Sequence, residues 1–347
     1  MDFANFLLIN FVNKDFIYIS ICIPVYDMEK YIERALLSIL NQSFQKYEII
    51  IVNDNSKDNT GKIIKNYSNK FNQIQIINHN TNFGVYYSRI EAILNSKGKY
   101  ILLIDPDDMI LNPKLFQELF NYNIYYNLDI IEFTVYLQIE EKKKIVFSKN
   151  HKLSHYHYFQ NKIIYQPELS DILFYIPNTK NYSSIICRPI WNKIIKKEIF
   201  LKTIKYTEKE FHNKYLIAAD DTPLNILNFQ YASNYSNINL PGYLYNIRTN
   251  SISRKENNET NYKLIISYNY LLYFKLFYKY IKDYNKDINY LLYDLRANFD
   301  YILRFNNCDI LEYKHIIINL FNNLLSKENI TNEFQDLFKG LLLNCIK

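Results

Sequence analysis

Three carboxylates within four residues, Asp105, Asp107 and Asp108, are the side chains of this sequence best suited to chemistry. They follow an apolar run, so the pattern places them at the end of a buried strand. Like charges this close repel one another unless a cation lies among them. Oxygen ligands favour Mg²⁺ or Mn²⁺, and Mg²⁺ takes one or two carboxylates together with water and phosphate oxygens. Taken alone, the cluster is equally compatible with a solvated acidic turn or a helix N-cap ahead of Pro113.

Two other predicted strands also end in residues that can bind a ligand. The run from Ile17 to Pro24 predicts a first strand, which leads into Pro24-Val25-Tyr26. The run from Tyr47 to Val52 predicts a second strand, which is followed by Asp54. In open α/β sheets, ligands bind outside the carboxyl ends of the strands. The three strand ends therefore offer a cation site, a hydrogen-bond acceptor and an aromatic or backbone platform, the groups that a nucleotide needs.

The elements that must position these residues alternate between strand and helix patterns. This alternation predicts an α/β fold with a mostly parallel central sheet. In the first half we expect helices over 58–69 and 85–95 and strands over 74–78 and 100–104. In the second half we expect a strand over 129–135, a hairpin over 136–148, a helical stretch over 190–228, a loop over 241–254 and about ninety further helical residues.

The bulk composition excludes several classes of protein. The net charge of +6 over 347 residues is spread along the chain, whereas a nucleic-acid-binding protein concentrates Lys and Arg on one face. This mild positive charge is compatible with peripheral attachment to the inner, anionic face of a cell membrane. The four cysteines show no zinc spacing and suit a reducing cytoplasm. No stretch has the length of a transmembrane helix, and no signal peptide is evident. The first strand–helix turn lacks the glycines of a dehydrogenase, and there is no Walker lysine loop.

Several motifs resemble those of the family-2 glycosyltransferases. The segment from Ile19 to Tyr26 is similar to the opening strand of that family, and Val52-Asn53-Asp54-Asn55-Ser56 is similar to its V-D-D-G-S segment, with Asn in place of the first Asp and of Gly. Asn82-Phe83-Gly84 followed by Arg89 resembles its N-x-G-x(4)-R stretch. Tyr100 to Asp108 resembles its D-S-D-D strand end. The resemblance is dense from Ile19 to Ile110 and thins to short islands after that.

The resemblance implies a GT-A fold, a UDP-sugar as donor substrate and Mn²⁺ or Mg²⁺ as cofactor. Residues at matching positions would bind the donor nucleotide: Pro24, Val25, Tyr26, Asp54, Asn82, Arg89 and Asp105. Asp107, with Asp105, would bind the metal, and Asp108 would support them. Arg248 and Ser251 follow a loop that resembles the family's segment over the diphosphate. Arg89 is also compatible with an ordinary surface position on its helix.

The catalytic base is sought in the segment Ala219-Asp220-Asp221-Thr222, which resembles the family's E-D motif. In the inverting members the Asp of this motif is the general base, so the resemblance assigns that role to Asp221. Asp220 stands where the family has Glu, and it is the other candidate. The pair is equally suited to capping the helix that begins near Pro223. Trp191 is a packing anchor or a platform for a sugar.

These features predict an inverting, metal-dependent hexosyltransferase that acts on a glycan acceptor. The expected acceptor is a bacterial surface glycan, such as lipooligosaccharide, capsule or lipid-linked oligosaccharide. We expect an N-terminal extension (1–15), a GT-A domain (16–254) and a helical C-terminal domain (255–347). Within the GT-A domain, about 16–112 would bind the nucleotide sugar and about 113–254 the acceptor. The alternatives are a catalytically silent binding or scaffold protein and a sugar nucleotidyltransferase.

Overall fold

The computed structural model describes most of the predicted GT-A domain. The described residues are 16–139, 144–147, 161–166, 169, 189–211, 216, 221–248, 269, 276, 279–280 and 283–284. The predicted N-terminal extension and most of the predicted helical domain therefore lie outside the described residues.

The first half of the chain alternates between strand and helix, as the sequence predicts. Its elements are β1 (Ile19–Val25), α2 (Ile32–Leu40), β2 (Tyr47–Asn53), α3 (Thr60–Ser68), β3 (Ile74–Asn78), α4 (Val85–Asn95) and β4 (Tyr100–Leu103). The strands β3, β2, β1 and β4 are neighbours in that order and are parallel. The bounds of β3 and α4 are those predicted from the sequence.

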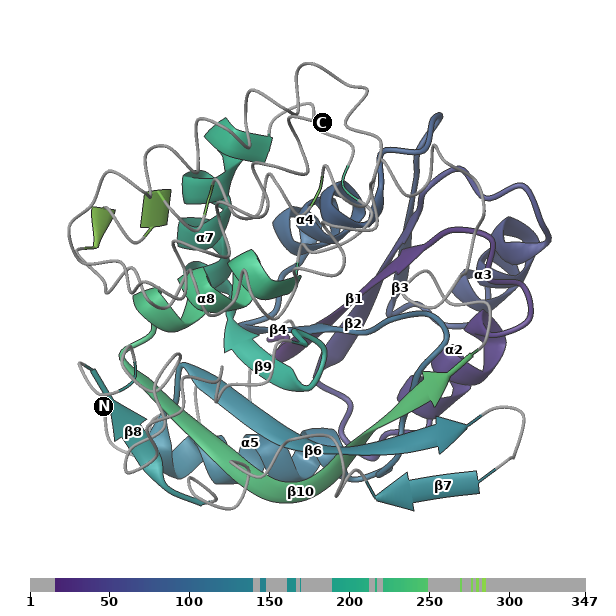
Figure 1. Cartoon of the computed structure of the whole chain (residues 1–347). Coiled ribbons are helices and arrows are strands. Elements are labelled where there is room, and N and C mark those ends of the chain that lie inside the picture. The colour runs from purple at the N-terminus through teal and green to yellow at the C-terminus, as the bar shows by residue number, and fades with distance from the viewer. Residues whose placement is uncertain are drawn as a thin grey trace, which may run out of the picture.

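Helices cover both faces of this parallel sheet. All seven residues of β1 are buried, as expected of a strand that is covered on both sides. Alternate residues Ile19, Ile21 and Ile23 form one core with buried residues of α2 and α5 (Leu115–Tyr126). Helix α4 packs on the opposite face against β1 and β2. Figure 1 shows α4 on one side of these strands and α2 on the other.

The second half of the described chain extends the same sheet. Its strands are β5 (Met109–Ile110), β6 (Ile130–Ile139), β7 (Lys144–Phe147), β8 (Ile163–Tyr165), β9 (Lys193–Lys196) and β10 (Asn234–Ile247). The order through the sheet is β3-β2-β1-β4-β9-β6-β10-β5, with β7 beside β6 and β8 beside β10. Strand β9 is antiparallel to β4 and β6, and β6 is parallel to β10. The predicted mostly parallel α/β fold and the hairpin formed by β6 and β7 are confirmed.

Two expectations for the second half are wrong. Residues Lys193–Lys196 form a strand rather than part of a helix, and the helices of this stretch are α7 (Lys197–Phe211) and α8 (Asp221–Tyr231). A short apolar run is compatible with a strand or with part of a helix. Here hydrogen-bond pairing with β4 on one side and β6 on the other favours the strand. Residues 241–247 belong to β10 rather than to a loop. Pro241 is tolerated because the register between β10 and β6 shifts on both sides of it.

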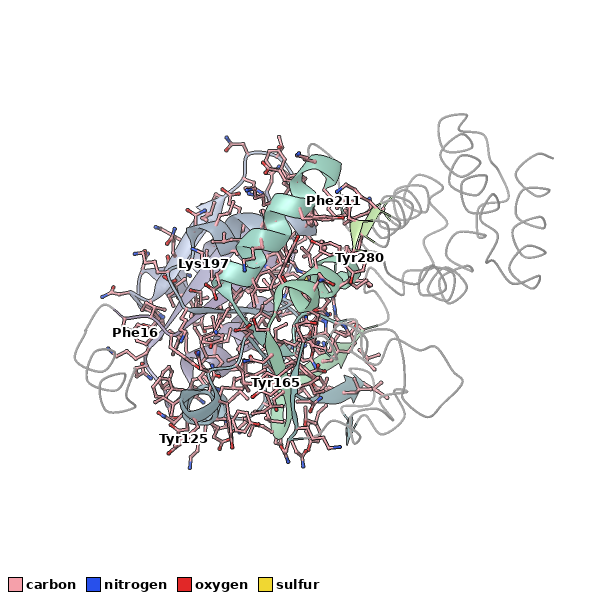
Figure 2. All side chains as sticks on the ribbon, turned by 90° about the vertical axis from the view of Figure 1, so that its left-hand side faces the viewer. Phe16, Tyr125, Tyr165, Lys197, Phe211 and Tyr280 are labelled. Atoms are coloured by element: carbon pink, nitrogen blue, oxygen red, sulfur yellow. The ribbon has the colours of Figure 1, made fainter. Side chains whose placement is uncertain are left out.

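A few described residues of the C-terminal region contact α7 and α8. The Tyr280 hydroxyl donates to Gln230 at 3.0 Å, and the Tyr206 hydroxyl donates to Asp283 at 2.7 Å. Figure 2 labels Tyr280 on the side of the molecule where α7 and α8 lie, in agreement with these contacts. The division of the chain into domains remains a prediction. Among the described helices, none has the length and apolar character needed to cross a membrane.

Candidate active site

The carboxyl ends of three adjacent parallel strands meet at one edge of the sheet. Strand β1 pairs with β2 on one side and β4 on the other, so Pro24, Asp54 and Asp105 come to the same edge. Pro24 and Val25 are buried in β1, whereas Tyr26, just beyond the strand, is 43% exposed. The structure thus brings together the strand ends that the sequence analysis singled out.

The three carboxylates of the acidic cluster occupy different environments. Asp108 is fully buried and accepts hydrogen bonds from the Tyr243 hydroxyl and the Asn246 amide, each at 2.7 Å. The side chains of Asp105 and Asp107 are 26% and 14% exposed. Asp105 forms an ion pair with Arg89 at 2.7 Å, and Asp107 forms one with Arg248 at 2.5 Å. Asp105 and Asp107 are therefore the carboxylates that a ligand can reach, and Asp108 supports the loop from below.

The cluster carries an electrostatic cost that a cation would relieve. Burial raises the pKa of Asp107, and the nearby charge of Asp105 raises it further, against the opposing effect of Arg248. Burial also raises the pKa of Asp108 well above its usual range, and both neighbouring carboxylates add to this shift. Among the described residues, no group of three or more His, Cys, Asp or Glu side chains forms a metal cage. Two accessible carboxylates fit Mg²⁺ or Mn²⁺ that completes its shell with water and phosphate oxygens.

Two guanidinium groups lie beside Asp107, those of Arg248 and Arg34, and Arg34 is absent from the sequence prediction. Arg248 lies 4.5 Å from the centre of the Tyr31 ring, and Arg34 lies 5.2 Å from it. Arg34 also donates to the backbone carbonyl of Asp107 at 2.6 Å. Tyr31 and Arg34 are three residues apart, so they lie on one side of the start of α2. That spacing was the available signal for Arg34.

Arg89 connects the two halves of the site. It is 4% exposed, so its interpretation as an ordinary surface residue of α4 is wrong. One guanidinium nitrogen contacts Asp105, and the other contacts Asp221, the first residue of α8. The Asp221 side chain is 29% exposed, so it can still reach a ligand. Its position in the first turn of α8 also suits the helix dipole. Asp220 and Ser251 lie outside the described residues.

Asp54 organises the loop that leads into α4. Its two carboxylate oxygens accept hydrogen bonds from the amides of Phe83 and Gly84, both at 2.8 Å. The Asn82 side chain accepts a second bond from the Gly84 amide at 3.1 Å and reaches the Tyr26 hydroxyl. The segment predicted to bind the nucleotide is therefore one connected unit, built on the end of β2.

The loop depends on a glycine, and this gives a stability prediction. Gly84 has a φ of 89°, and a β-carbon there would lie 2.5 Å from the backbone oxygen of Leu216. Gly84→Ala is therefore expected to reduce the free energy of unfolding by about 2 kcal/mol or more, through strain and displaced backbone. The control is Gly61→Ala in α3, where the nearest atom is 3.5 Å away and helix propensity favours Ala. Urea denaturation of both variants measures the difference. Equal stabilities for G84A and the wild type would contradict the prediction.

Trp191 packs beneath the acidic cluster rather than standing free. It is 8% exposed, and its ring stacks on Tyr243 at 4.4 Å and on Tyr245 at 5.2 Å. The Tyr243 hydroxyl in turn donates a hydrogen bond to Asp108 and accepts one from the Asp105 amide at 3.2 Å. These contacts favour the packing-anchor interpretation of Trp191. Tyr243 was missed by the sequence analysis because it lies in the stretch 241–254, which was expected to be a loop.

Comparison with known proteins identifies relatives of this chain. The sequence model described as Glycosyl transferase family 2 matches residues 20–200. The chain is 26% identical over 235 residues to the uncharacterized glycosyltransferase EpsJ of Bacillus subtilis (strain 168), covering 68% of this chain and 62% of EpsJ. It is 42% identical over 95 residues to a poly(ribitol-phosphate) β-glucosyltransferase of Bacillus spizizenii, covering 26% of this chain and 15% of that protein. The chain thus spans less than two thirds of both relatives.

A solved structure shares the fold. S. aureus TarS 1–349 in complex with UDP-GlcNAc superposes with a TM-score of 0.51 at 17% sequence identity. The match covers 82% of this chain and 80% of the TarS chain.

Proposed function

The chain belongs to glycosyltransferase family 2, and from this premise we propose that it transfers a hexose or N-acetylhexosamine from a UDP-sugar to a hydroxyl group of a bacterial surface glycan. The GT-A fold implied by the sequence is confirmed by the mostly parallel sheet and by the similarity to TarS. The observation that carries the proposal is that Arg89 contacts both Asp105 and Asp221. This contact brings a carboxylate suited to the donor and one suited to the acceptor to the same place.

The proposed reaction is a single displacement with inversion at the anomeric carbon. The acceptor oxygen forms a bond to that carbon while the bond to the diphosphate oxygen breaks, and UDP leaves with the electron pair. The acceptor proton passes to a carboxylate, and we assign this role to Asp221. Its contact with Arg89 restrains the carboxylate, and its exposure leaves room for the acceptor.

The donor half of the site would hold the nucleotide and its diphosphate. Asp105 and Asp107 would hold Mn²⁺ or Mg²⁺, which when bound supplies neutralisation of the leaving diphosphate. The guanidinium groups of Arg34 and Arg248 flank Asp107 and add positive charge on the same side. Pro24, Tyr26, Asp54 and Asn82 would surround the base.

Product analysis tests the proposal against its alternatives. The purified chain is incubated with a panel of UDP- and GDP-sugars, Mn²⁺ and glycan acceptors, and the products are identified by mass spectrometry. A glycosyltransferase releases a nucleoside diphosphate, a sugar nucleotidyltransferase exchanges pyrophosphate, and a silent binding protein releases neither. The relative named as a poly(ribitol-phosphate) β-glucosyltransferase makes a polyol-phosphate polymer a reasonable first acceptor, besides lipooligosaccharide, capsule and lipid-linked oligosaccharides.

Arg248 is expected to contribute to donor affinity. Arg248→Ala should raise the KM for the UDP-sugar about tenfold, because a charge-assisted bond to a phosphate is lost. Arg248→Lys is the control: it keeps the charge but loses the planar fork that stacks near Tyr31, so an intermediate KM is expected. Steady-state kinetics with varied donor concentration measures both. An unchanged KM in R248A would contradict the proposed diphosphate contact.

A further inference from the structure

His79 lies at the same sheet edge as Asp54 but has no role in the reaction outlined above. It follows β3, and its amide donates to the Asn53 carbonyl at 2.9 Å, which fixes it beside the end of β2. Its side chain is 7% exposed. The rule that ligand-binding residues follow the strands, which singled out Asp54 and Asp105, applies equally to this position.

The imidazole of His79 lies between two carboxylates. Nδ1 is 2.7 Å from Asp54 Oδ1, and Nε2 contacts Glu91 Oε2 on α4. The Phe83 ring packs edge-on against it at 5.0 Å. A neutral imidazole has one N–H group, so only the imidazolium can donate to both carboxylates. Burial lowers the pKa of His79, but the hydrogen bonds and charges of Asp54 and Glu91 raise it more, so the net shift is upward.

The Asp54 carboxylate is nearly saturated with donors. Phe83 and His79 bond to Oδ1, and Gly84 bonds to Oδ2. A carboxylate offers about four acceptor positions, so one remains, on the Oδ2 side. The amides of Phe83 and Gly84 hold the carboxylate from the loop side, and His79 holds it from the end of the neighbouring strand, β3. Glu91 anchors the imidazole in turn, and its side chain is 41% exposed.

We propose that His79 is a positioning residue for donor recognition: held by Glu91, it fixes Asp54 so that the remaining acceptor position meets the nucleobase. This inference rests on the proposed function, because it requires Asp54 to bind the base of the donor. His79 does not touch the reacting atoms. Its loss therefore weakens nucleotide binding without slowing the chemical step.

The expected effects separate this role from a purely structural one. His79→Gln keeps a donor toward Asp54 but carries no charge, and it should weaken UDP binding about tenfold at pH 7, with kcat changed less than about twofold. In the wild type, UDP affinity should decrease as pH rises through the pKa of His79, since the imidazolium is lost. In Glu91→Gln this decrease should begin at lower pH, because one of the two carboxylates that raise the pKa is gone.

Isothermal titration calorimetry with UDP and Mn²⁺ between pH 6 and 9 tests the proposal. The control is Glu33→Gln, which removes an exposed carboxylate on α2 and should follow the wild type at every pH. Titration of the nucleotide itself affects the wild type and every variant equally, so it cancels in the ratio of the variant affinity to the wild-type affinity at each pH. Thermal melts establish that H79Q and E91Q are folded.

Three outcomes are decisive. Weaker binding in H79Q together with an earlier pH transition in E91Q supports the proposal. Unchanged UDP affinity in folded H79Q, or a transition in E91Q at the same pH as in the wild type, overturns the role of His79 and leaves the proposed function intact. A wild-type chain that binds no nucleoside diphosphate overturns the proposed function and this inference with it.

Discussion

Replacement of Asp221 by Asn is expected to lower kcat about 10³-fold, as for loss of a general base, and to change the Kd for UDP less than about threefold. Asn has nearly the same shape as Asp but cannot take up the proton of the acceptor hydroxyl group. Arg89 keeps its ion pair with Asp105 at 2.7 Å, so the donor half of the site should remain in place. The kcat is measured from UDP release at saturating donor, and the Kd by calorimetry.

Asp220→Asn is the matched control for this change. The substitution is chemically identical and lies one residue earlier in the chain, so it distinguishes the two candidate bases. A large loss of kcat in D221N with a small loss in D220N assigns the base to Asp221. The reverse result would transfer the role to Asp220. Similar activity in both variants and the wild type would contradict a carboxylate base in this segment.

Asp107→Asn is expected to lower kcat/KM about 10³-fold, because a divalent cation contributes several kcal/mol to neutralising the leaving diphosphate. The dependence of turnover on Mn²⁺ concentration should also shift to higher concentrations. Asp108→Asn is the control: Asp108 is fully buried and is engaged by Tyr243 and Asn246, so a ligand cannot reach it. Its kcat/KM should fall less than about tenfold, since the site itself is retained. Equal losses in the two variants would contradict the assignment of Asp107 as metal ligand.

Asp107→Asn should not reduce the stability of the folded protein. The folded protein raises the pKa of Asp107, mainly by burial, above its unfolded value of about 4. Between these two pKa values the folded state binds more protons than the unfolded chain, so ionisation of Asp107 lowers stability as pH rises through that window. Asn carries no such penalty. D107N should therefore unfold at the same temperature as the wild type or higher at pH 7, with the difference disappearing below about pH 4. A lower Tm at pH 7 would contradict this account.

The sequence by itself determined the parallel half of the molecule. Short β-branched runs such as Ile49-Ile50-Ile51-Val52, followed by the turn residues Asn53-Asp54-Asn55-Ser56, favour strands buried on both faces, and the segments between these strands show helical periodicity. Parallel neighbours end at one edge, so the clustering of Pro24, Asp54 and Asp105 followed from their positions after the strands. The family resemblance was also carried by this half, where the motifs are dense.

The family resemblance implies separate roles for the acidic cluster, but only the tertiary structure shows how burial distinguishes its three carboxylates. Asp105, Asp107 and Asp108 are chemically equivalent in the sequence, and local spacing does not show which of them is buried. Strand β10 decides this, because its Tyr243 and Asn246 engage Asp108 and leave the other two accessible. The part of this strand from residue 241 onward was expected to be a loop. Pro241 and Gly242 are turn residues, and sheet pairing with β6 overrides their preference.

The contact between Arg89 and Asp221 also could not be predicted from the sequence. Arg89 and Asp221 are 132 residues apart, and no periodicity relates residues at that distance. They meet because α4 and α7 pack on the same side of the sheet and α7 packs on α8, so the start of α8 lies near Arg89. Local pattern therefore places each candidate residue at the end of its own element. The ion pairs of Arg89 with Asp105 and Asp221 arise from long-range packing.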